Sequence, residues 1–461
     1  MNDPVLTVAE MREAERASIT RGTRELELMQ RAGRGAAEWV HRVAAGRPVT
    51  VLCGPGNNGG DGYVIAEALR ERSNSVTVIA PVEPETETAA AVREAYHGAT
   101  EAGGTLGDPV VVDCLFGSGL SRRVDDPFKN LLEQMSANSC FKIAIDVPSC
   151  VESDTGCILG PCAHYDLTLA LGAFKQAHFL MPSAARMGTL RLVDIGLEFG
   201  ATGARRAGEI APSAPQANAH KYSRGLVAVI GGDMPGAAIL AARAAMRSGA
   251  GYVKLLAAHA HPDLSADLVW DPSDLKNALA DERLSSILVG PGLGRDKDAR
   301  EKLLLAIDCA KPCVVDADAL HLLDPDVIEG VDVTKLCLTP HDGELAALCA
   351  AFGIAASGKL AQARGLHDVT GMAVLAKGAD SMLFADGRCW FFDRGSPWLA
   401  TAGTGDVLAG ILAARLAVHG DVGRAAREAF ALHNESARLN GPAFTAGDLA
   451  DSVSDAMTSL S

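Results

Sequence analysis

The chain has 461 residues, 48% of them apolar and 21% charged, which predicts two or three globular domains rather than one. Its formal net charge of -15 argues against nucleic acid as a partner, because phosphate backbones are bound by basic faces. A small anionic ligand remains compatible with this charge, since a local group of backbone N–H donors can bind an anion on an acidic protein.

The chain ends and the cysteines point to an ordinary intracellular protein. The eleven cysteines are odd in number and lack paired CxxC spacing, so neither a disulfide framework nor a zinc site is expected. The segment MNDPVLTVAEMREAERASI has neither the basic nor the apolar region of a signal peptide. No stretch approaches the ~20 uninterrupted apolar residues of a membrane span. We expect a soluble, cytoplasmic protein with no membrane partner.

Helix and strand patterns alternate in the first part of the chain. Apolar residues recur at helical spacing from Val8 to Val43, with a break at Gly22, which predicts two helices. A strand over 49–53, a glycine loop over 54–62 and a helix over 63–70 follow, as in the opening unit of a doubly wound sheet. Further strands are predicted over 76–80, 110–116, 142–147 and 166–171, with a helix over 87–96.

Polar residues follow three of these strands, at the ends where ligands of parallel sheets bind. They are Asn57, Asn58 and Asp61 after the first strand, Asp113 with residues 117–120, and Asp146 with Ser149. This arrangement predicts one polar site at the edge of the sheet. The alternative is that the acids only cap helices and turns, as acids after strands often do.

Between Gly196 and Ala219 the apolar pattern lapses, and we place a domain boundary there. The predicted domains are residues 1–205 and 216–461. The second domain is also α/β, and we see no internal repeat beyond this shared architecture. Its predicted strands are 226–230, 253–256, 286–289, 312–316, 335–338, 373–377 and 381–384, with a helix over 239–248.

The stretch TAGTGDVLAGIL places Gly403, Gly405 and Gly410 around Asp406 and leads into an apolar helix pattern. A glycine-rich turn at a helix start presents N–H groups and a partial positive charge to an anion such as phosphate. A carboxylate there repels phosphate unless it has another task, such as taking a proton from a hydroxyl. The simpler interpretation is that Asp406 is a solvated acid in the first helical turn.

Eight motifs of the second domain occur in a set that is known from one family: HKYSRG from His220, VIGG from Val229, GAAILAARAAMRSGAGYV from Gly236, GPGLGRD from Gly290, VVDADAL from Val314, LTPHDGE from Leu338, KGADS from Lys377 and AGTGDVLAGIL from Ala402. Together they resemble the ribokinase-like NAD(P)H-hydrate dehydratases. The distinguishing residue is His341, because kinases of this fold that phosphorylate thiamine precursors tend to have Asn there.

The first domain carries LMQRAG from Leu28, GPGNNGGDG from Gly54, VDCLFGSGL from Val112, IDVPSC from Ile145, DTG from Asp154, and Lys175 after an apolar strand. These resemble the NAD(P)H-hydrate epimerases, which are often fused to the dehydratases in bacteria. The resemblance implies two doubly wound domains, a Rossmann-like epimerase fold and a ribokinase-like fold. Two departures are Cys150, where the family usually has Gly, and Gln176-Ala177, where it usually has Pro-Gly.

The implied substrates are NADHX and NADPHX, in which water has added across the 5,6 double bond of the nicotinamide ring. The dehydratase would move a phosphoryl group from ADP or ATP to the C6 hydroxyl, after which the lone pair of N1 expels phosphate. Asp406 would be the general base, and the N–H groups of Gly403 and Gly405 would stabilise the transferred group. With ADP, the usual donor in bacterial members, the products are NAD(P)H, AMP and phosphate.

The resemblance also implies binding residues in the dehydratase domain. Glu344 would hold Mg²⁺ through water. The nucleotide would contact Lys377, Gly378, Ala379, Asp380, Ser381, Gly403 and Gly405. The hydrate would contact Gly236, Ala238, Gly292, His341 and Asp406. The residues have simpler interpretations too: His341 as a core or cap histidine, Glu344 as a solvated helix acid and Lys377 as a surface lysine.

The epimerase would interconvert the R and S forms at C6, with Asp146 and Lys175 handling protons as the ring opens. The implied K⁺ ligands are Asn58, Asp113 and Ser149, whose oxygens suit a hard cation. The implied hydrate contacts are Asn57, Asn58, Gly59, Gly60, Asp61, Gly117, Ser118, Gly119, Leu120, Ser121, Arg122, Arg123 and Asp146.

Two other functions fit the same motifs. One is a kinase of this fold that phosphorylates a vitamin precursor and releases the product. The other keeps the dehydratase and makes the N-terminal domain a non-catalytic binding module. The sequence leaves open the choices between ADP and ATP and between NADHX and NADPHX. We expect a homo-oligomer.

Overall fold

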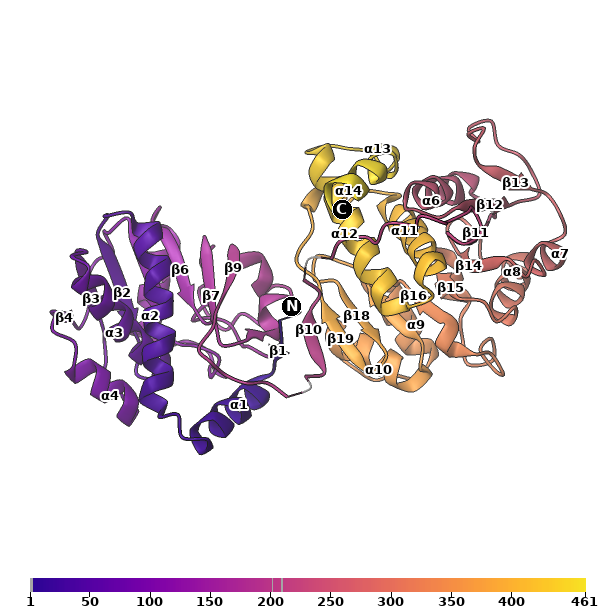
Figure 1. The fold of residues 1–461 in the computed structure, drawn as a ribbon. Helices are drawn as coiled ribbons and strands as arrows, with labels where there is room; N and C mark the ends of the chain where they lie inside the picture. Colours follow the sequence, from indigo (N-terminus) through magenta and orange to yellow (C-terminus); the bar gives the residue numbers. More distant parts are fainter. Residues whose placement is uncertain (1–2, 201, 209) are drawn as a thin grey trace. The chain divides into compact units, whose positions relative to one another are not determined.

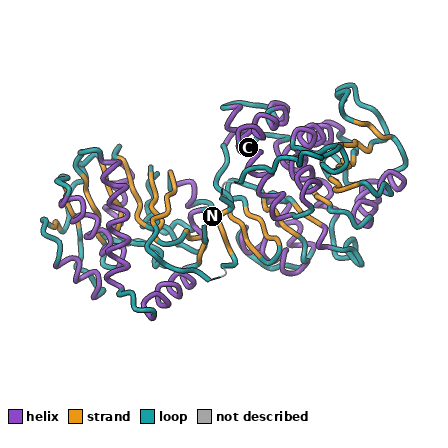
Figure 2. The backbone as a smooth tube through the Cα atoms, in the orientation of Figure 1, coloured by secondary structure: helices purple, strands orange, loops and turns teal. Residues whose placement is uncertain are grey.

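The computed structural model describes residues 3–200, 202–208 and 210–461. The chain divides into two compact units, Met1–Arg206 and Ala207–Ser461. In each unit strands lie side by side in a central sheet with helices packed around it (Figures 1 and 2). The α/β fold predicted for both halves is therefore confirmed.

Unit 1 is built on a seven-stranded parallel sheet in the order β4-β3-β2-β5-β6-β7-β9. The strands of this sheet are β2 Val49–Cys53, β3 Val76–Ile79, β4 Thr100–Glu101, β5 Val110–Cys114, β6 Phe141–Ile145, β7 Leu167–Leu171 and β9 Thr189–Val193. The unit also contains three short strands outside it, β1 Val5–Leu6, β8 Phe174–Lys175 and β10 Ala204–Arg206. The helices are α1 Val8–Thr20, α2 Glu25–Ala44, α3 Asn57–Glu71, α4 Glu87–Glu94 and α5 Phe128–Ala137.

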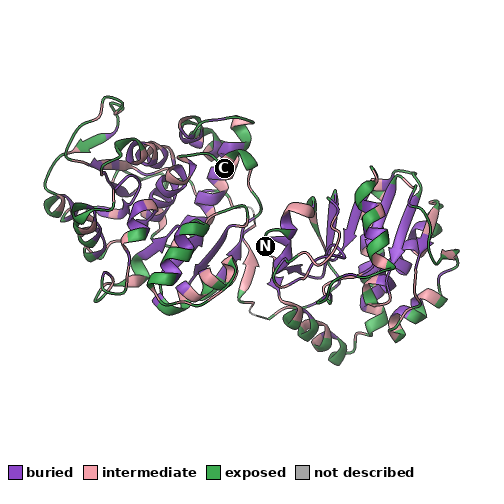
Figure 3. Cartoon of the chain, turned by 180° about the vertical axis from the view of Figure 1, so that it is seen from behind, coloured by how far each residue is buried: buried purple, intermediate pink, exposed green. Residues whose placement is uncertain are grey.

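Alternate residues of β2 enter two different cores, as the period of two in a strand requires. Val49 and Val51 pack with α2 and α3 on one face of the sheet. Leu52 packs with α5 on the other. The strands are thus covered on both faces (Figure 3), which explains why they read as short, continuous apolar runs in the sequence.

Unit 2 has a sheet in the order β19-β18-β17-β16-β15-β14-β11-β12-β13, parallel from β17 to β13. The strands are β11 Leu226–Ile230, β12 Tyr252–Leu256, β13 Val269–Asp271, β14 Leu284–Val289, β15 Cys313–Val315, β16 Leu336–Leu338, β17 Ala373–Ala376, β18 Met382–Ala385 and β19 Arg388–Phe391. The helices are α6 Pro235–Arg247, α7 Leu275–Leu279, α8 Lys297–Asp308, α9 Asp342–Ala351, α10 Lys359–Thr370, α11 Thr404–His419, α12 Val422–Asn440, α13 Ala446–Asp451 and α14 Val453–Ser459.

Both sheets are wound in the same way. In unit 1 the chain runs from β2 outward to β4, returns, and continues from β5 in the opposite direction. In unit 2 it runs from β11 outward to β13 and continues from β14 on the other side. The crevice between the two central strands, β2 and β5 or β11 and β14, is the switch point where such sheets bind ligands.

All predicted strands are present, with ends within two residues of the prediction. The predicted loop over 54–62 is wrong from Asn57 onward, because α3 begins there and contains the glycines of the motif. Asn and Gly are poor helix formers, which is why the sequence indicated a loop. The packing requires them: a Cβ on Gly59 would lie 1.9 Å from the carbonyl oxygen of Gly54.

Gly54 lies at the switch point of unit 1, and an alanine there is expected to destabilise the unit. A Cβ on Gly54 would lie 1.7 Å from the carbonyl oxygen of Leu115, so the loops after β2 and β5 must separate. We expect the free energy of unfolding of unit 1 to fall by roughly 1–3 kcal/mol or more. Amide hydrogen exchange across β2 and β5 measures this fall. Gly56→Ala is the matched control, because a Cβ on Gly56 meets no atom within 4 Å; equal exchange in both variants would contradict the prediction.

Three exclusions made from the sequence can be compared with the described residues. Among them, no helix is both long and apolar enough to span a bilayer. All eleven cysteines carry free thiols. Within the described ranges no three His, Cys, Asp or Glu side chains come together as metal ligands.

Candidate active sites

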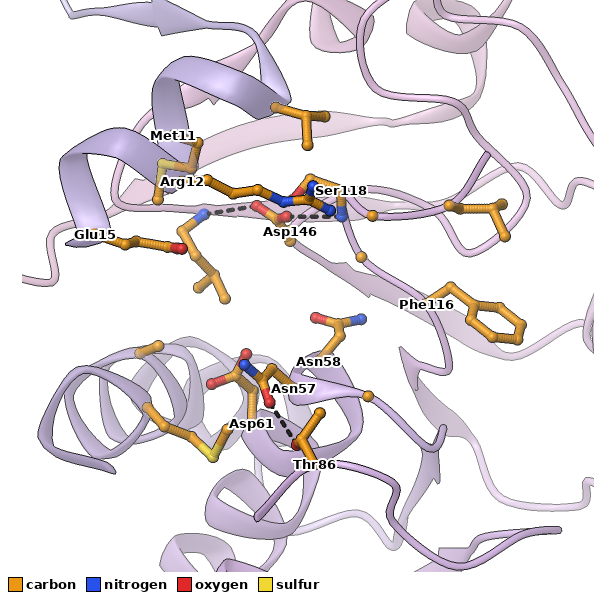
Figure 4. A pocket seen from close by; sticks show the side chains of 18 of the residues that line it. Met11, Arg12, Glu15, Asn57, Asn58, Asp61, Thr86, Phe116, Ser118 and Asp146 are labelled. Carbon is orange, nitrogen blue, oxygen red and sulfur yellow. Dashed lines mark hydrogen bonds between the residues drawn. The ribbon is translucent and has the colours of Figure 1, made fainter. Parts of the chain in front are cut away.

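A cavity of about 1060 Å³ opens at the switch point of unit 1. Its walls come from the segments after β2, β5 and β6 and from helices α1 and α2. Figure 4 shows Asp146, Ser118 and Arg12 on one side and Asn57, Asn58 and Asp61 of α3 on the other. The predicted site residues that line it are Asn57, Asn58, Asp61, Gly117, Ser118, Gly119, Leu120, Ser121, Arg122, Asp146 and Lys175.

Other predicted residues support the cavity without lining it. Gly59 packs on the backbone of Gly54, and a Cβ on Gly60 would lie 2.6 Å from the Cε of Met29. Arg123 is exposed and is not part of the cavity wall. The structure thus gives Gly59 and Gly60 a packing role, because they bring α3 close to the sheet and to α2.

Asp113 and Ser149 lie beneath the cavity, both fully buried. The Ser149 hydroxyl donates to Oδ1 of Asp113 at 2.5 Å, and the Ser149 N–H donates to Oδ2 at 3.0 Å. The hydroxyl of Tyr165 also donates to Oδ2, at 2.5 Å. Burial raises the pKa of Asp113 and these hydrogen bonds pull it back only in part. The two Ser149–Asp113 hydrogen bonds fix the segments after β5 and β6 relative to each other.

Asn58 is the one predicted potassium ligand with unused polar atoms. Both its Oδ1 and Nδ2 are buried and have no hydrogen-bond partner. Its side chain faces the glycine loop after β5, since a Cβ on Gly117 would lie 3.2 Å from the Asn58 Cγ. A buried amide without a partner is costly unless a ligand satisfies it. The unpartnered amide oxygen of Asn58 therefore fits a hard cation such as K⁺.

Asp146 and Lys175 form a buried ion pair at the cavity floor, in which the Lys175 Nζ donates to the Asp146 Oδ1. Lys175, 1% exposed, also donates to the carbonyl oxygens of Leu171 at 2.7 Å and Ala173 at 3.0 Å. Burial raises the pKa of Asp146, but the Lys175 ammonium outweighs burial and holds it below its usual value. Asp146 is thus an ionised carboxylate, which is the form of a proton acceptor.

Asp146 has a left-handed backbone with φ of 67°, which is uncommon for a residue other than glycine. His178, which the sequence did not single out, holds it there. His178 Nδ1 accepts from the Lys175 N–H at 2.8 Å, so its Nε2–H donates to the Asp146 carbonyl at 2.8 Å. Burial and the Lys175 charge lower the pKa of His178 to about 4, so the ring is neutral. The only sequence feature that could have indicated this role is the position of His178, three residues after Lys175.

Helix α1 also lines the cavity, and its Met11, Arg12 and Glu15 are among the lining residues that sequence analysis did not identify. Burial raises the pKa of Glu15, and the Lys175 charge opposes this only in part. Arg12 lies over the glycine loop after β5, because a Cβ on Gly119 would lie 3.8 Å from its Nη2. Their helix is far from the motifs in the sequence, so only the fold brings them to the site.

The residues that depart from the family pattern are accommodated without strain. Cys150 is fully buried and has no left-handed backbone, so its β-carbon fits the turn after Ser149. Gln176 and Ala177 are buried as well, and the Ala177 N–H donates to the carbonyl oxygen of Ser153 at 2.9 Å. Neither change disturbs the Asp146–Lys175 pair.

A second polar site lies at the carboxyl ends of five adjacent strands in unit 2, β11, β14, β15, β16 and β17. Lys377 follows β17, and its Nζ lies 2.5 Å from Oδ1 of Asp316, which follows β15. The hydroxyl of Thr339, after β16, donates to the same oxygen at 2.7 Å. Lys377 is thus a half-buried, ion-paired residue rather than a surface lysine. Asp316 and Thr339 were not predicted.

Helix α11 begins at Thr404 beside this cluster, with Gly403 at φ of 89° as its cap. No side chain caps the helix, so its first N–H groups point to an open site. A Cβ on Gly405 would lie 3.4 Å from the Lys377 Nζ, which places the ammonium next to the helix start. A helix N-terminus beside a lysine is an arrangement that suits an anion such as phosphate, the ligand that the glycine-rich turn predicted.

Asp406 is in the first turn of α11 and half buried. Burial and the negative charge of Asp316 raise its pKa to about 6, although Lys377 lowers it in part. Asp318 and Glu344 also raise this pKa, which shows that the acids after β15 and β16 surround the carboxyl. A carboxylate with a pKa near the working pH is a suitable general base.

His341 caps helix α9, as one of the simpler interpretations proposed. Its Nδ1 accepts from the N–H groups of Gly343 at 3.0 Å and Glu344 at 3.3 Å, and Glu344 Oε2 accepts from the His341 N–H at 2.8 Å. The His341 ring is exposed, and its Nε2 lies 3.5 Å from Oε1 of the buried Glu344. Glu344 is buried, not a solvated acid, and its Oε1 accepts no hydrogen bond from the described residues.

The side chains of the KGADS loop hold the loop itself. The Ser381 hydroxyl donates to the Gly378 carbonyl at 2.8 Å and accepts from the Gly378 N–H at 3.0 Å. Lys359 of α10 donates to Asp380 at 2.7 Å and to the carbonyl oxygen of Lys377 at 2.7 Å. These hydrogen bonds fix the conformation of the loop, in which Gly378 and Ala379 are exposed.

The predicted hydrate residues near β11 and β14 lie on two joined loops. The Met234 N–H donates to the carbonyl oxygen of Gly292 at 3.0 Å, and Gly292 has a φ of 63°. Gly236 is exposed at the start of α6, whereas the Ala238 side chain is buried in the core. The loops thus bring Gly236 and Gly292 to the same switch point of the sheet.

Both units match known protein families. Residues 227–459 match the model described as NAD(P)H-hydrate dehydratase, and residues 25–177 match the model described as YjeF-related protein N-terminus. Relatives named bifunctional NAD(P)H-hydrate repair enzyme occur in Salinibacter ruber, Coxiella burnetii and Mycobacterium tuberculosis. They are 32%, 31% and 33% identical, over 88%, 93% and 85% of this chain and 86%, 93% and 84% of the relative.

The chain belongs to the family of bifunctional NAD(P)H-hydrate repair enzymes. The resemblance identified from the motifs is therefore confirmed. A solved structure from Bacillus subtilis, an ADP/ATP-dependent NAD(P)H-hydrate dehydratase co-crystallised with ATP/Mg²⁺, is 25% identical. It covers 54% of this chain and 95% of its own, with a TM-score of 0.46.

Proposed function

We propose that the chain repairs hydrated nicotinamide cofactors: unit 1 interconverts the R and S forms of NAD(P)HX, and unit 2 converts the S form to NAD(P)H at the expense of ADP or ATP. The observation that carries the proposal is the membership of the full two-unit chain in the repair family. Each unit has a polar site at its switch point, which supports two activities rather than one.

In unit 2, Asp406 takes the proton of the C6 hydroxyl as its oxygen attacks the terminal phosphoryl group of the nucleotide. The uncapped N-terminus of α11 and the Lys377 ammonium stabilise the charge on the transferred group. The phosphate ester is a better leaving group than hydroxide, so the lone pair of N1 expels it and leaves an iminium at N1=C6. Loss of a proton from C5 to water then restores the 5,6 double bond. The hydrate lies against Gly236, Gly292 and His341.

Glu344 is the proposed Mg²⁺ residue, through water on Oε1, and the ion would neutralise phosphate charge. The nucleotide follows the backbone of residues 377–381 and reaches the α11 N-terminus at Gly403 and Gly405. This assignment is supported by the exposure of Gly378 and Ala379 and by the negative charges of Asp316, Asp318 and Glu344, which raise the pKa of Asp406.

In unit 1, the Asp146 carboxylate takes the proton of the C6 hydroxyl and the ring opens between C6 and N1. The aldehyde that forms can close on either face, which inverts C6. Lys175 keeps Asp146 ionised, and His178 keeps its backbone in place. The residues proposed to hold K⁺ are Asn58, Asp113 and Ser149, and the ion would fix the loops around the hydrate.

The experiment is the recovery of NADH absorbance from separated R-NADHX and S-NADHX by the full chain, with ADP or ATP. Recovery from S-NADHX with a nucleotide, and slower recovery from R-NADHX, is the expected result. No recovery with either nucleotide contradicts the dehydratase, and accumulation of a phosphorylated vitamin precursor supports the kinase alternative. Recovery from S-NADHX alone supports the non-catalytic N-terminal module.

The dehydration rate is expected to depend on pH through Asp406. Its pKa is raised to about 6, so the carboxylate that acts as base is present above this pH and is lost as the pH falls below it. We expect kcat/KM for S-NADHX to fall about tenfold for each pH unit below this pKa. A rate that stays constant well below pH 6 would contradict the base role of Asp406.

Removal of K⁺ is expected to slow conversion of the R epimer. Exchange of K⁺ for tetramethylammonium removes the ion that would satisfy the buried amide of Asn58, so we expect at least a tenfold loss of R-NADHX recovery. Asn58→Leu serves as the comparison, because it lacks the amide oxygen and should be slow with either cation. Equal rates for the parent chain with both cations would contradict the potassium site.

The location and assembly of the chain remain predictions. We propose that it acts in the cytoplasm, where its nucleotide substrates occur, and that it forms a homo-oligomer. Fractionation of cells and light scattering of the purified chain test these two statements.

A further inference from the structure

A second carboxyl group faces Asp146 across the cavity of unit 1. Asp61 lies on α3, on the wall opposite Asp146 (Figure 4), and lines the same cavity. It is 8% exposed. Within residues 3–200, where the cavity lies, no hydrogen bond or ion pair engages its carboxyl group, in contrast to Asp146 with Lys175.

The two acids occupy opposite electrostatic environments. Burial raises the pKa of Asp61 well above its usual value, and the charges of Asp146 and Glu15 raise it further, while Lys175 lowers it. Asp61 therefore holds a proton more readily than Asp146, which the Lys175 ion pair keeps ionised. Two carboxyl groups in one cavity whose surroundings push their pKa values apart are the arrangement of a general acid and a general base.

Epimerisation at C6 needs such a pair. As Asp146 removes the hydroxyl proton, the C6–O bond becomes a carbonyl and the C6–N1 bond breaks. The electron pair of that bond stays on N1, which then needs a proton to become a neutral amine. After rotation about the C5–C6 bond, N1 attacks the other face of the carbonyl, releases its proton, and the new alkoxide takes the proton back from Asp146.

We propose that Asp61 is the catalytic acid of the epimerase, which gives its proton to N1 when the ring opens and recovers it when the ring closes. The inference rests on the proposed epimerase function and adds a proton donor to it. Each conversion returns Asp61 and Asp146 to their starting states, so no other reactant is consumed. It also explains why a buried carboxyl group is left without a partner in a cavity built for a ligand.

Glu15 is the competing candidate for this role, because it lines the same cavity and burial raises its pKa too. Asp61 is favoured because it is buried, whereas Glu15 is only half buried, and because it shares α3 with Asn57 and Asn58. If Asp61 is the acid, Asp61→Asn lowers kcat for R-NADHX; if Glu15 is the acid, Glu15→Gln lowers it instead.

The test uses Asp61→Asn in the full chain, with R-NADHX and S-NADHX as separate substrates. We expect conversion of R-NADHX to fall by about 10²–10⁴-fold in kcat, with KM changed less than about threefold. Recovery of NADH from S-NADHX stays at the parental rate, which shows that unit 2 and the amount of active chain are unchanged, and amide hydrogen exchange across β2 and β5 shows that unit 1 is folded. Glu133→Gln, an exposed acid of α5, is the control for loss of a charge.

Three results would overturn the proposal: parental kcat in Asp61→Asn, an effect of Asp61→Asn on KM alone, or a loss of kcat in Glu15→Gln that Asp61→Asn does not show.

A separate isotope experiment tests which bond at C6 breaks. With ¹⁸O on the C6 hydroxyl, ring opening retains the label in a single turnover, whereas loss and return of water exchanges it. Failure of the parent chain to convert R-NADHX would instead refute the epimerase function itself.

Discussion

Asp406→Asn is expected to lower the rate of NADH recovery from S-NADHX by about 10²–10⁴-fold, while nucleotide binding stays within a few fold of the parent. The reason is that the amide cannot accept the C6 hydroxyl proton, whereas the proposed phosphate site consists of the N-terminus of α11 and Lys377, which the change leaves in place. Single-turnover recovery of NADH absorbance measures the chemical step, and equilibrium dialysis with ADP and ATP measures binding.

This variant is not expected to unfold. Because the pKa of Asp406 is raised to about 6, its ionisation is less favourable in the folded than in the unfolded chain, and at neutral pH the ionised carboxyl lowers stability. Asp298→Asn is the matched control, since Asp298 is an exposed acid in the first turn of α8. Lost nucleotide binding with an intact chemical rate would contradict the base role.

Asp146→Asn is expected to slow recovery from R-NADHX by about 10²–10⁴-fold and to leave recovery from S-NADHX unchanged. Asparagine accepts the left-handed backbone of this position and retains an oxygen for Lys175, but it cannot take the hydroxyl proton. The second activity of the same chain serves as the internal control for folding and concentration. The two rates are measured by NADH absorbance with separated epimers.

A result in which Asp146→Asn clears R-NADHX as fast as the parent would refute the proton-accepting role and support a non-catalytic N-terminal unit. Uncatalysed interconversion of the epimers sets the lower limit of the assay, so the chain is added in excess over this background. Lys175→Met is less informative, because it leaves a buried carboxylate without its partner and is expected to destabilise unit 1 by roughly 3–5 kcal/mol.

The sequence predicted most of the fold, because buried parallel strands are short apolar runs and the loops between them carry glycine. It predicted the wrong structure for residues 57–62, where Asn and Gly favour a loop locally and the packing of α3 on Gly54 and Met29 requires a helix. It also assigned Gly59 and Gly60 to the ligand, although the structure gives them a packing role.

By itself the sequence determined the two α/β halves, the strand–glycine–helix order at both switch points, and the candidate base Asp406, because these depend on neighbours in the chain. Only the tertiary structure decided which side chains meet: Lys377 with Asp316, Asp146 with Lys175 and His178, and Asp61 facing Asp146. Their pKa values follow from burial and from charges on other elements, and the order of residues in the chain specifies neither.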